Sequence, residues 1–231
     1  MNFYDYHLHS ENIQETVEVA KKLGLSGLCF VINWTNKDDL EAFKAKLPKE
    51  NIDLFLGVEL HEKSGNVSII AKKIRKDVDV ILVHGGDLEV NRTAVETPEV
   101  DILLHPEMER DDQGLDHVMV RLAKENNVAI DFAFNDVMYS YDKTRVRVLS
   151  NLVKNAALVK KYKAPFVLTS GGYSSWDLRS PSELISFGKV LGFDIPQIKQ
   201  ALSDWLVKEN RKRLEGKWIQ PGVEIKTNSN I

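Results

Sequence analysis

Cysteine is nearly absent from this sequence. The only cysteine among the 231 residues is Cys29, in the apolar run GLCFVI, so no disulfide can form within the chain. A single thiol in such a run fits a reducing compartment, and we expect a cytoplasmic protein. No stretch approaches the roughly 20 apolar residues that a membrane-spanning helix requires. The N-terminus also lacks the basic segment and apolar core of a secretory signal.

The sequence also lacks a large excess of charge of one sign and an internal linker. The formal net charge is -3, which gives no global indication of nucleic-acid binding but leaves room for a local basic patch. Hydrophobic residues make up 43% of the chain, which suits one large domain with a substantial core. We expect a single domain at residues 1–216. Residues 217–231 are expected to form an extended tail, with the last five or so polar and disordered.

What the sequence does contain is a regular alternation of short apolar runs and amphipathic helical patterns. The predicted strands are Phe3–Leu8, Gly27–Ile32, Asp53–Leu60, Val78–Val83, Asp101–Leu104, Val128–Phe132 and Phe166–Thr169. Their nearly continuous hydrophobicity is typical of strands covered on both faces. Because a helical pattern follows each run, we expect a parallel sheet.

Regular units at this chain length favour an α/β fold that closes into a TIM-like barrel. An open doubly wound parallel sheet is the alternative, although no G-x-G-x-x-G follows the first strand. Near the C-terminus, Ser180 and Glu183 form a predicted capping box with Pro181 at the first helical position. A last helix is predicted from about Pro196 to Arg213.

Histidines gather where the predicted strands end. The segment FYDYHLHS carries two of the six histidines, and three others lie at or just after the ends of the third, fourth and fifth strands. In a parallel barrel these ends meet at one face, where active sites are built. Imidazoles with a carboxylate suit Zn, Mn or Fe, and scattered polar loop residues are the alternative interpretation. The candidate metal ligands are His7, His9, Glu59, His84 and His105.

This arrangement resembles the polymerase and histidinol phosphatase (PHP) family. The resemblance implies a distorted (β/α)7 barrel with a metal centre that hydrolyses phosphoesters. That family closes its site with a D-x-H after a late strand, where this chain has Thr169, Ser170, Gly171 and Gly172. No histidine follows His117. The resemblance therefore implies an eroded metal site, at which a lone ion could still bind.

A second resemblance covers residues 3 to 224. The segments FYDYHLHS, GLCFVI, DVILVHGGD, VDILLHPE, NNVAIDFAF, PFVLTSGGYSSWDLRSP and PGVE, in this order, are similar to the family of ribonuclease P protein component 3. Its members are archaeal relatives of the thirty-kilodalton subunit of the eukaryotic enzyme.

This second resemblance implies a subunit of the endoribonuclease that removes the 5′ leader of precursor tRNA. The subunit would bind and support the catalytic RNA and would not itself be the catalyst. The implied partners are ribonuclease P RNA, precursor tRNA, other ribonuclease P proteins and protein component 2, in a heterodimer or a two-plus-two assembly. No tightly bound cofactor is implied, and magnesium would serve the RNA.

Cationic side chains are the candidates for contact with RNA phosphates. The arginines expected in loops after strands are favoured, because guanidinium groups bind phosphate in a bidentate manner. For the others, an ordinary solvated helix face is the alternative. The candidates are Arg92, Arg110 and Arg179 in loops, and Lys72, Lys73, Arg75, Arg145 and Arg147 elsewhere.

Three functions therefore remain open from the sequence. The first is an RNA-binding subunit of ribonuclease P. The second is a PHP-type metal-dependent phosphoesterase, and the third is an interaction module that makes no contact with RNA.

Overall fold

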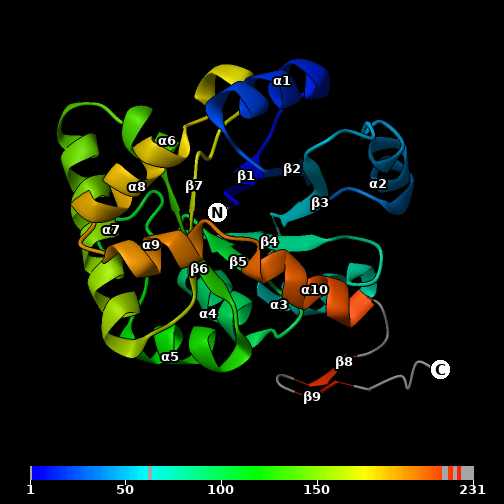
Figure 1. Cartoon of the computed structure of the whole chain (residues 1–231). Coiled ribbons are helices and arrows are strands. Elements are labelled where there is room, and N and C mark those ends of the chain that lie inside the picture. The colour runs from blue at the N-terminus through cyan, green and yellow to red at the C-terminus, as the bar shows by residue number, and fades with distance from the viewer. Residues whose placement is uncertain (1, 62–63, 215–217, 221–222, 225–231) are drawn as a thin grey trace.

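The computed structural model describes residues 2–61, 64–214, 218–220 and 223–224 (Figure 1). Seven strands form one parallel sheet in sequential order. They are β1 (Tyr4–Leu8), β2 (Gly27–Asn33), β3 (Asp53–Leu60), β4 (Val80–His84), β5 (Ile102–Leu104), β6 (Ala129–Ala133) and β7 (Phe166–Thr169). All seven predicted strands are confirmed, with ends that shift by no more than two residues.

The sheet curls into a nearly closed barrel. The first and last strands meet at a parallel bridge between Leu8 and Gly172. The amide of His9 donates a hydrogen bond to the carbonyl of Gly172 at 2.7 Å. The predicted barrel is therefore confirmed, and the alternative of an open doubly wound sheet is wrong, because such a sheet would keep its two outer strands apart.

Helices surround the strands (Figure 1). They are α1 (Ile13–Leu23), α2 (Lys37–Lys44), α3 (Ser64–Ile74), α4 (Leu88–Glu96), α5 (His117–Asn126), α6 (Phe134–Met138), α7 (Asp142–Tyr162), α8 (Pro181–Val190), α9 (Ile195–Ala201) and α10 (Trp205–Leu214), with a short 3-10 helix, η1 (Ser175–Asp177). The capping box of Ser180 and Glu183 begins α8, as predicted. Among the described residues, no helix is long and apolar enough to cross a membrane.

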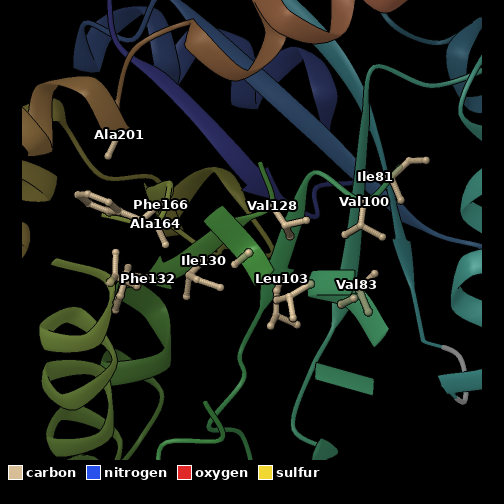
Figure 2. Close-up of a cluster of buried hydrophobic side chains, with 14 of the residues drawn as sticks. Ile81, Val83, Val100, Leu103, Val128, Ile130, Phe132, Ala164, Phe166 and Ala201 are labelled. Carbon is tan, nitrogen blue, oxygen red and sulfur yellow. The ribbon is translucent and has the colours of Figure 1, made fainter. Parts of the chain in front are cut away.

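The core has an outer layer and an inner layer. The outer layer lies between strands and helices, and Figure 2 shows part of it, including Leu103, Ile130 and Phe132. The inner layer fills the barrel and includes Tyr6, Phe55 and Leu82. Burial of these side chains supplies the main driving force for folding.

The predicted helix from Pro196 to Arg213 is wrong, because two helices, α9 and α10, occupy this segment. The chain between them interacts with the first strand. The carbonyl of Leu202 accepts a hydrogen bond from the amide of Tyr4, and the carbonyl of Ser203 accepts one from the hydroxyl of Tyr6. Leu206 of α10 then packs into the inner layer of the core. Helix α10 therefore closes the end of the barrel where the strands begin, which leaves the opposite face for the site.

Part of the predicted tail is ordered into strands. β8 (Trp218–Gln220) and β9 (Val223–Glu224) pair in an antiparallel manner. The predicted domain boundary at residue 216 and the predicted disorder of the last five residues fall outside the described residues. The boundary therefore stays a prediction.

Candidate functional site

Glu59 is the centre of a histidine cluster on the face where the strands end. Its carboxylate is buried near the end of β3. His9 Nε2 lies 2.7 Å from Oε2, His61 Nε2 lies 3.0 Å from Oε1, and His84 Nδ1 lies 2.7 Å from Oε1. The barrel thus brings β1, β3 and β4 together at one carboxylate.

Two further histidines adjoin this cluster, and each has its own carboxylate. His7 Nδ1 lies 3.0 Å from Asp131 Oδ2, and Asp131 also accepts a hydrogen bond from the Thr169 hydroxyl. His105 Nδ1 lies 2.7 Å from Asp136 Oδ2. A carboxylate on one ring nitrogen fixes the orientation of the ring, as it does for histidines that bind metals.

Burial and hydrogen bonds shift the pKa values of Glu59, His61 and His105. Burial raises the pKa of Glu59, but hydrogen bonds with His61, His84 and His9 outweigh it and hold the pKa well below its ordinary range. The hydrogen bond with Glu59 raises the pKa of His61. Burial lowers the pKa of His105, but Asp136 outweighs it and raises the value to about 10. The cluster is therefore a network of alternating acidic and basic groups.

The donors in this cluster could hold one metal ion. Among the described residues, two groups of three could do so, because in each group the three ligand atoms lie within 4.8 Å of one another. The first group is His7, His9 and Glu59. The second group is Glu59, His61 and His84. Two imidazoles and a carboxylate suit zinc and similar ions. Four of the five predicted ligands are in these groups, His61 is an addition, and His105 is in neither group. Metal binding at this cluster stays a prediction.

The end of β7 provides no closing ligand. The hydroxyl of Thr169 is used by Asp131, and the hydroxyl of Ser170 accepts a hydrogen bond from the amide of Arg179. A Cβ on Gly171 would lie 2.6 Å from the Cβ of Ala133, and one on Gly172 would lie 2.4 Å from the Cβ of Asp177. Neither glycine could become a ligand without a shift of the backbone. These residues therefore do not fit a multinuclear centre closed from β7.

The candidate arginines differ in their surroundings. Arg110 and Arg179 lie in loops on the face of the histidine cluster, after β5 and after η1. We expected Arg92 in a loop, and this prediction is wrong. Arg92 lies in α4, where its Nε pairs with Glu96 at 2.8 Å. The side chain of Asp87 caps this helix and starts it before Arg92. Arg110 pairs with Asp112 at 2.7 Å.

The remaining candidates lie in α7, in α3 and just after α3. Arg145 and Arg147 lie in the first two turns of α7, and Arg147 pairs with Asp111 at 2.8 Å. Lys72 and Lys73 are exposed on α3. Arg75, just after α3, uses both terminal nitrogens within the protein, toward Asp101 and backbone carbonyls. Arg179 likewise directs its terminal nitrogens to the carbonyls of Trp176 and Leu178 and to Asn135. Arg75 is set apart by its low exposure of 13%, which leaves it little available to a phosphate, and the RNA contacts of all eight candidates stay predictions.

Sequence reasoning missed the carboxylates that hold His7 and His105. Asp131 lies within the fully buried strand β6, and a charged residue in so apolar a run was the signal that could have indicated it. Asp136 lies in α6, after the same strand. The cavity beside His105, which Arg110, Tyr139, Arg147 and Tyr173 help to line, was also missed. It depends on three segments far apart in the sequence.

Comparisons with known proteins agree over almost the whole chain. Residues 2–213 match the family described as RNase P subunit p30. Ribonuclease P protein component 3 of Methanosarcina mazei is 35% identical, with 96% of this chain and 95% of that protein covered. The corresponding protein of Methanococcoides burtonii is 36% identical, with 97% and 94% covered.

Solved structures give the same result. A chain in the cryo-EM structure of archaeal ribonuclease P with mature tRNA has a TM-score of 0.80 and 28% identity, with 99% of this chain and 100% of that chain covered. Ochratoxinase of A. niger has a TM-score of 0.61 at 6% identity, with 90% and 71% covered, which is a likeness of fold alone.

Proposed function

Because the chain belongs to the RNase P subunit p30 family, we propose that it is a protein subunit of ribonuclease P, the endoribonuclease that removes the 5′ leader of precursor tRNA. The observation that carries this proposal is the likeness of the whole barrel to a chain within archaeal ribonuclease P. The curated relatives, which are matched over nearly their full length, support it.

The subunit acts by binding and supporting the catalytic RNA, and the RNA performs the cleavage with magnesium. The end of β7 supports a non-catalytic role for the protein, because it offers neither a carboxylate nor an imidazole to complete a hydrolytic metal centre. No tightly bound cofactor is part of the proposal.

The partners are ribonuclease P RNA, precursor tRNA and the other ribonuclease P proteins. Component 2 pairs with this chain as a heterodimer or in a two-plus-two assembly. The setting is the cytoplasm, and the free buried thiol of Cys29 supports a reducing compartment.

Reconstitution tests the proposal. Cleavage of precursor tRNA is measured with ribonuclease P RNA and its other proteins, with and without this chain, over a range of magnesium concentrations. We expect the chain to raise the cleavage rate or to lower the magnesium requirement. An identical rate and an identical magnesium requirement in both series would refute the proposed function.

The histidine cluster favours one second candidate, a PHP-type metal-dependent phosphoesterase. His7, His9 and Glu59, or Glu59, His61 and His84, would hold the ion. A bound metal ion would lower the pKa of a water ligand and supply a nucleophile.

Metal content after purification without chelators, and hydrolysis of phosphate esters without RNA, separate this candidate from the first. Stoichiometric metal, with activity that is lost in His9→Ala, would favour the phosphoesterase. Absence of hydrolysis in the metal-loaded chain would exclude it.

A further inference from the structure

A cavity of about 550 Å³ lies beside the histidine cluster, on the face where the strands end. The loop after β5, the helices α6 and α7 and the turn after β7 form its walls. We name it the β5–α7 cavity, and its lining includes Arg110, Tyr139, Arg147 and Tyr173. The volume falls within the range of about 300–1,000 Å³ that is usual for small-ligand sites.

Two tyrosine side chains that line this cavity are exposed to solvent. Tyr139 is 54% exposed and Tyr173 is 67% exposed, which is high for large aromatic side chains. Both rings are nevertheless held in place. The ring of Tyr173 stacks on His9 with 5.6 Å between centroids and 21° between planes, and the hydroxyl of Tyr139 donates a hydrogen bond to Asp177. Fixed, exposed rings of this kind are the surfaces on which unpaired bases stack.

The two arginines of the cavity differ in how firmly the protein holds them. Arg110 is paired with Asp112 and Arg147 with Asp111, and these two carboxylates are 59% and 96% exposed. Exposed ion pairs contribute little to stability, so a phosphate can replace Asp111 at small cost. Arg110 binds both oxygens of Asp112 and the carbonyl of Gly86, so it adds its charge beside the phosphate while this pair is kept. A guanidinium group also matches the geometry of a phosphate.

Three acidic side chains belong to the lining itself. Asp136 is paired with His105, and Glu107 is buried. Glu109, the remaining carboxylate of the lining, is exposed. The polar side chains Asn135 and Asn151 add hydrogen-bonding groups to the wall. The wall combines amides, tyrosines and arginines with the apolar side chains of Met108 and Val148. This mixture suits the base and the phosphate of a nucleotide, whereas a protein helix needs a continuous hydrophobic groove.

We propose that the β5–α7 cavity binds a single unpaired nucleotide of an RNA, with the base stacked on Tyr173 and the phosphates held by Arg147 and Arg110. This proposal rests on the proposed function, which supplies the RNA. It assigns RNA contact to tyrosines that charge alone would not select. It also assigns different roles to the neighbouring groups, since the ring binds the base and the guanidinium groups bind the backbone.

The first test measures the affinity of the full chain for ribonuclease P RNA at several salt concentrations. Tyr173→Ala should weaken binding about tenfold and leave the slope of log K against log salt unchanged, because a stacked base releases no counterions. Tyr173→Trp should restore the affinity. Arg147→Ala should weaken binding and reduce the slope by about one.

Two matched controls lie outside the cavity. Trp176 is 85% exposed and does not line it, so Trp176→Ala controls for the loss of a surface aromatic. Arg121 is exposed on α5, so Arg121→Ala controls for the loss of a surface charge. Both variants should bind like the unmodified chain. Thermal unfolding of every variant confirms that the fold is retained.

The second test locates the contact by photocrosslinking the reconstituted particle with RNA that carries 4-thiouridine. We expect crosslinks to peptides that contain Tyr139 or Tyr173.

The outcomes separate the two proposals. If the unmodified chain binds RNA and stimulates cleavage while Tyr173→Ala and Arg147→Ala bind equally well, the cavity proposal alone is wrong. Crosslinks that fall only on peptides outside the cavity would also overturn it. If the unmodified chain neither binds RNA nor changes cleavage, the proposed function fails with it.

Discussion

Asp177 stabilises the turn that follows β7 through hydrogen bonds. Its carboxylate accepts hydrogen bonds from the hydroxyls of Tyr139 and Ser174 and from the amides of Tyr173 and Ser174. Burial raises the pKa of Asp177, but the hydrogen bond from Tyr139 and those from Tyr173 and Ser174 outweigh it and hold the pKa below its ordinary value of 3.8. The ionised carboxylate therefore stabilises the folded state, and this contribution is lost as the pH falls through the folded pKa.

We expect Asp177→Asn to lower the free energy of unfolding by about 1–3 kcal/mol at pH 7, since part-buried donors lose a charged acceptor. The difference from the unmodified chain should shrink as the pH is lowered below 3.8. Urea unfolding at several pH values measures it. As a control, Asp111→Asn removes an almost fully exposed carboxylate and should change stability by less than about 0.5 kcal/mol. A difference for Asp177→Asn that grew toward low pH would contradict this account.

Arg75 is a structural residue with few donors left for RNA. Its guanidinium group bonds Asp101 and three backbone carbonyls between α3 and the strands β4 and β5. Asp101 is buried, so Arg75→Met should leave an unpaired buried charge and cost about 3–5 kcal/mol in unfolding free energy. Thermal unfolding checks the loss. Lys72→Met, one turn away and exposed, is the matched control and should leave stability nearly unchanged. Equal stabilities of the two variants would refute the structural role.

The site residues that the sequence could indicate are those at the ends of strands. His7, His9, Glu59 and His84 follow from strand periodicity together with the convergence of parallel strands. Asp131 and Asp136 did not follow, because their partners come from β1 and from the loop after β5. Such pairing depends on the curvature of the barrel, which local patterns do not contain.

The turn between β7 and η1 depends on glycine. Gly171 has φ +62, a left-handed conformation, and a Cβ there would lie 2.6 Å from the Cβ of Ala133. Gly192, after α8, is also left-handed at φ +91 but has no atom within 4 Å of an added Cβ. Gly192→Ala should therefore cost only the conformational term of about 1–2 kcal/mol, and Gly171→Ala should cost clearly more.

Urea unfolding of the two variants, with unchanged m values, measures this difference. Equal losses would mean that the turn after β7 relaxes freely around an added methyl group. A large loss in Gly171→Ala would mean that the turn, which carries the bridge between Leu8 and Gly172, keeps a fixed conformation.

Strands were predicted better than the final helices. Most residues of every strand in the sheet are buried, so the local run of apolar residues marks its bounds. The break between α9 and α10 is not local. It occurs where Leu202 and Ser203 direct carbonyls to Tyr4 and Tyr6, nearly 200 residues earlier in the chain. A helical pattern of apolar residues cannot reveal such a contact.

For the molecule as a whole, we expect the salt dependence of RNA affinity to come from arginines on the face where the strands end. Each phosphate contact that is lost should reduce the slope of log K against log salt by about 0.7–0.9. Arg110→Ala combined with Arg179→Ala should therefore flatten the slope, whereas Lys72→Ala combined with Lys73→Ala, on α3, should not. Replacement of the same two arginines by lysine keeps the charge and should keep the slope. If the α3 pair flattened the slope instead, the RNA would lie on the outer helices, and the face where the strands end would not be its binding surface.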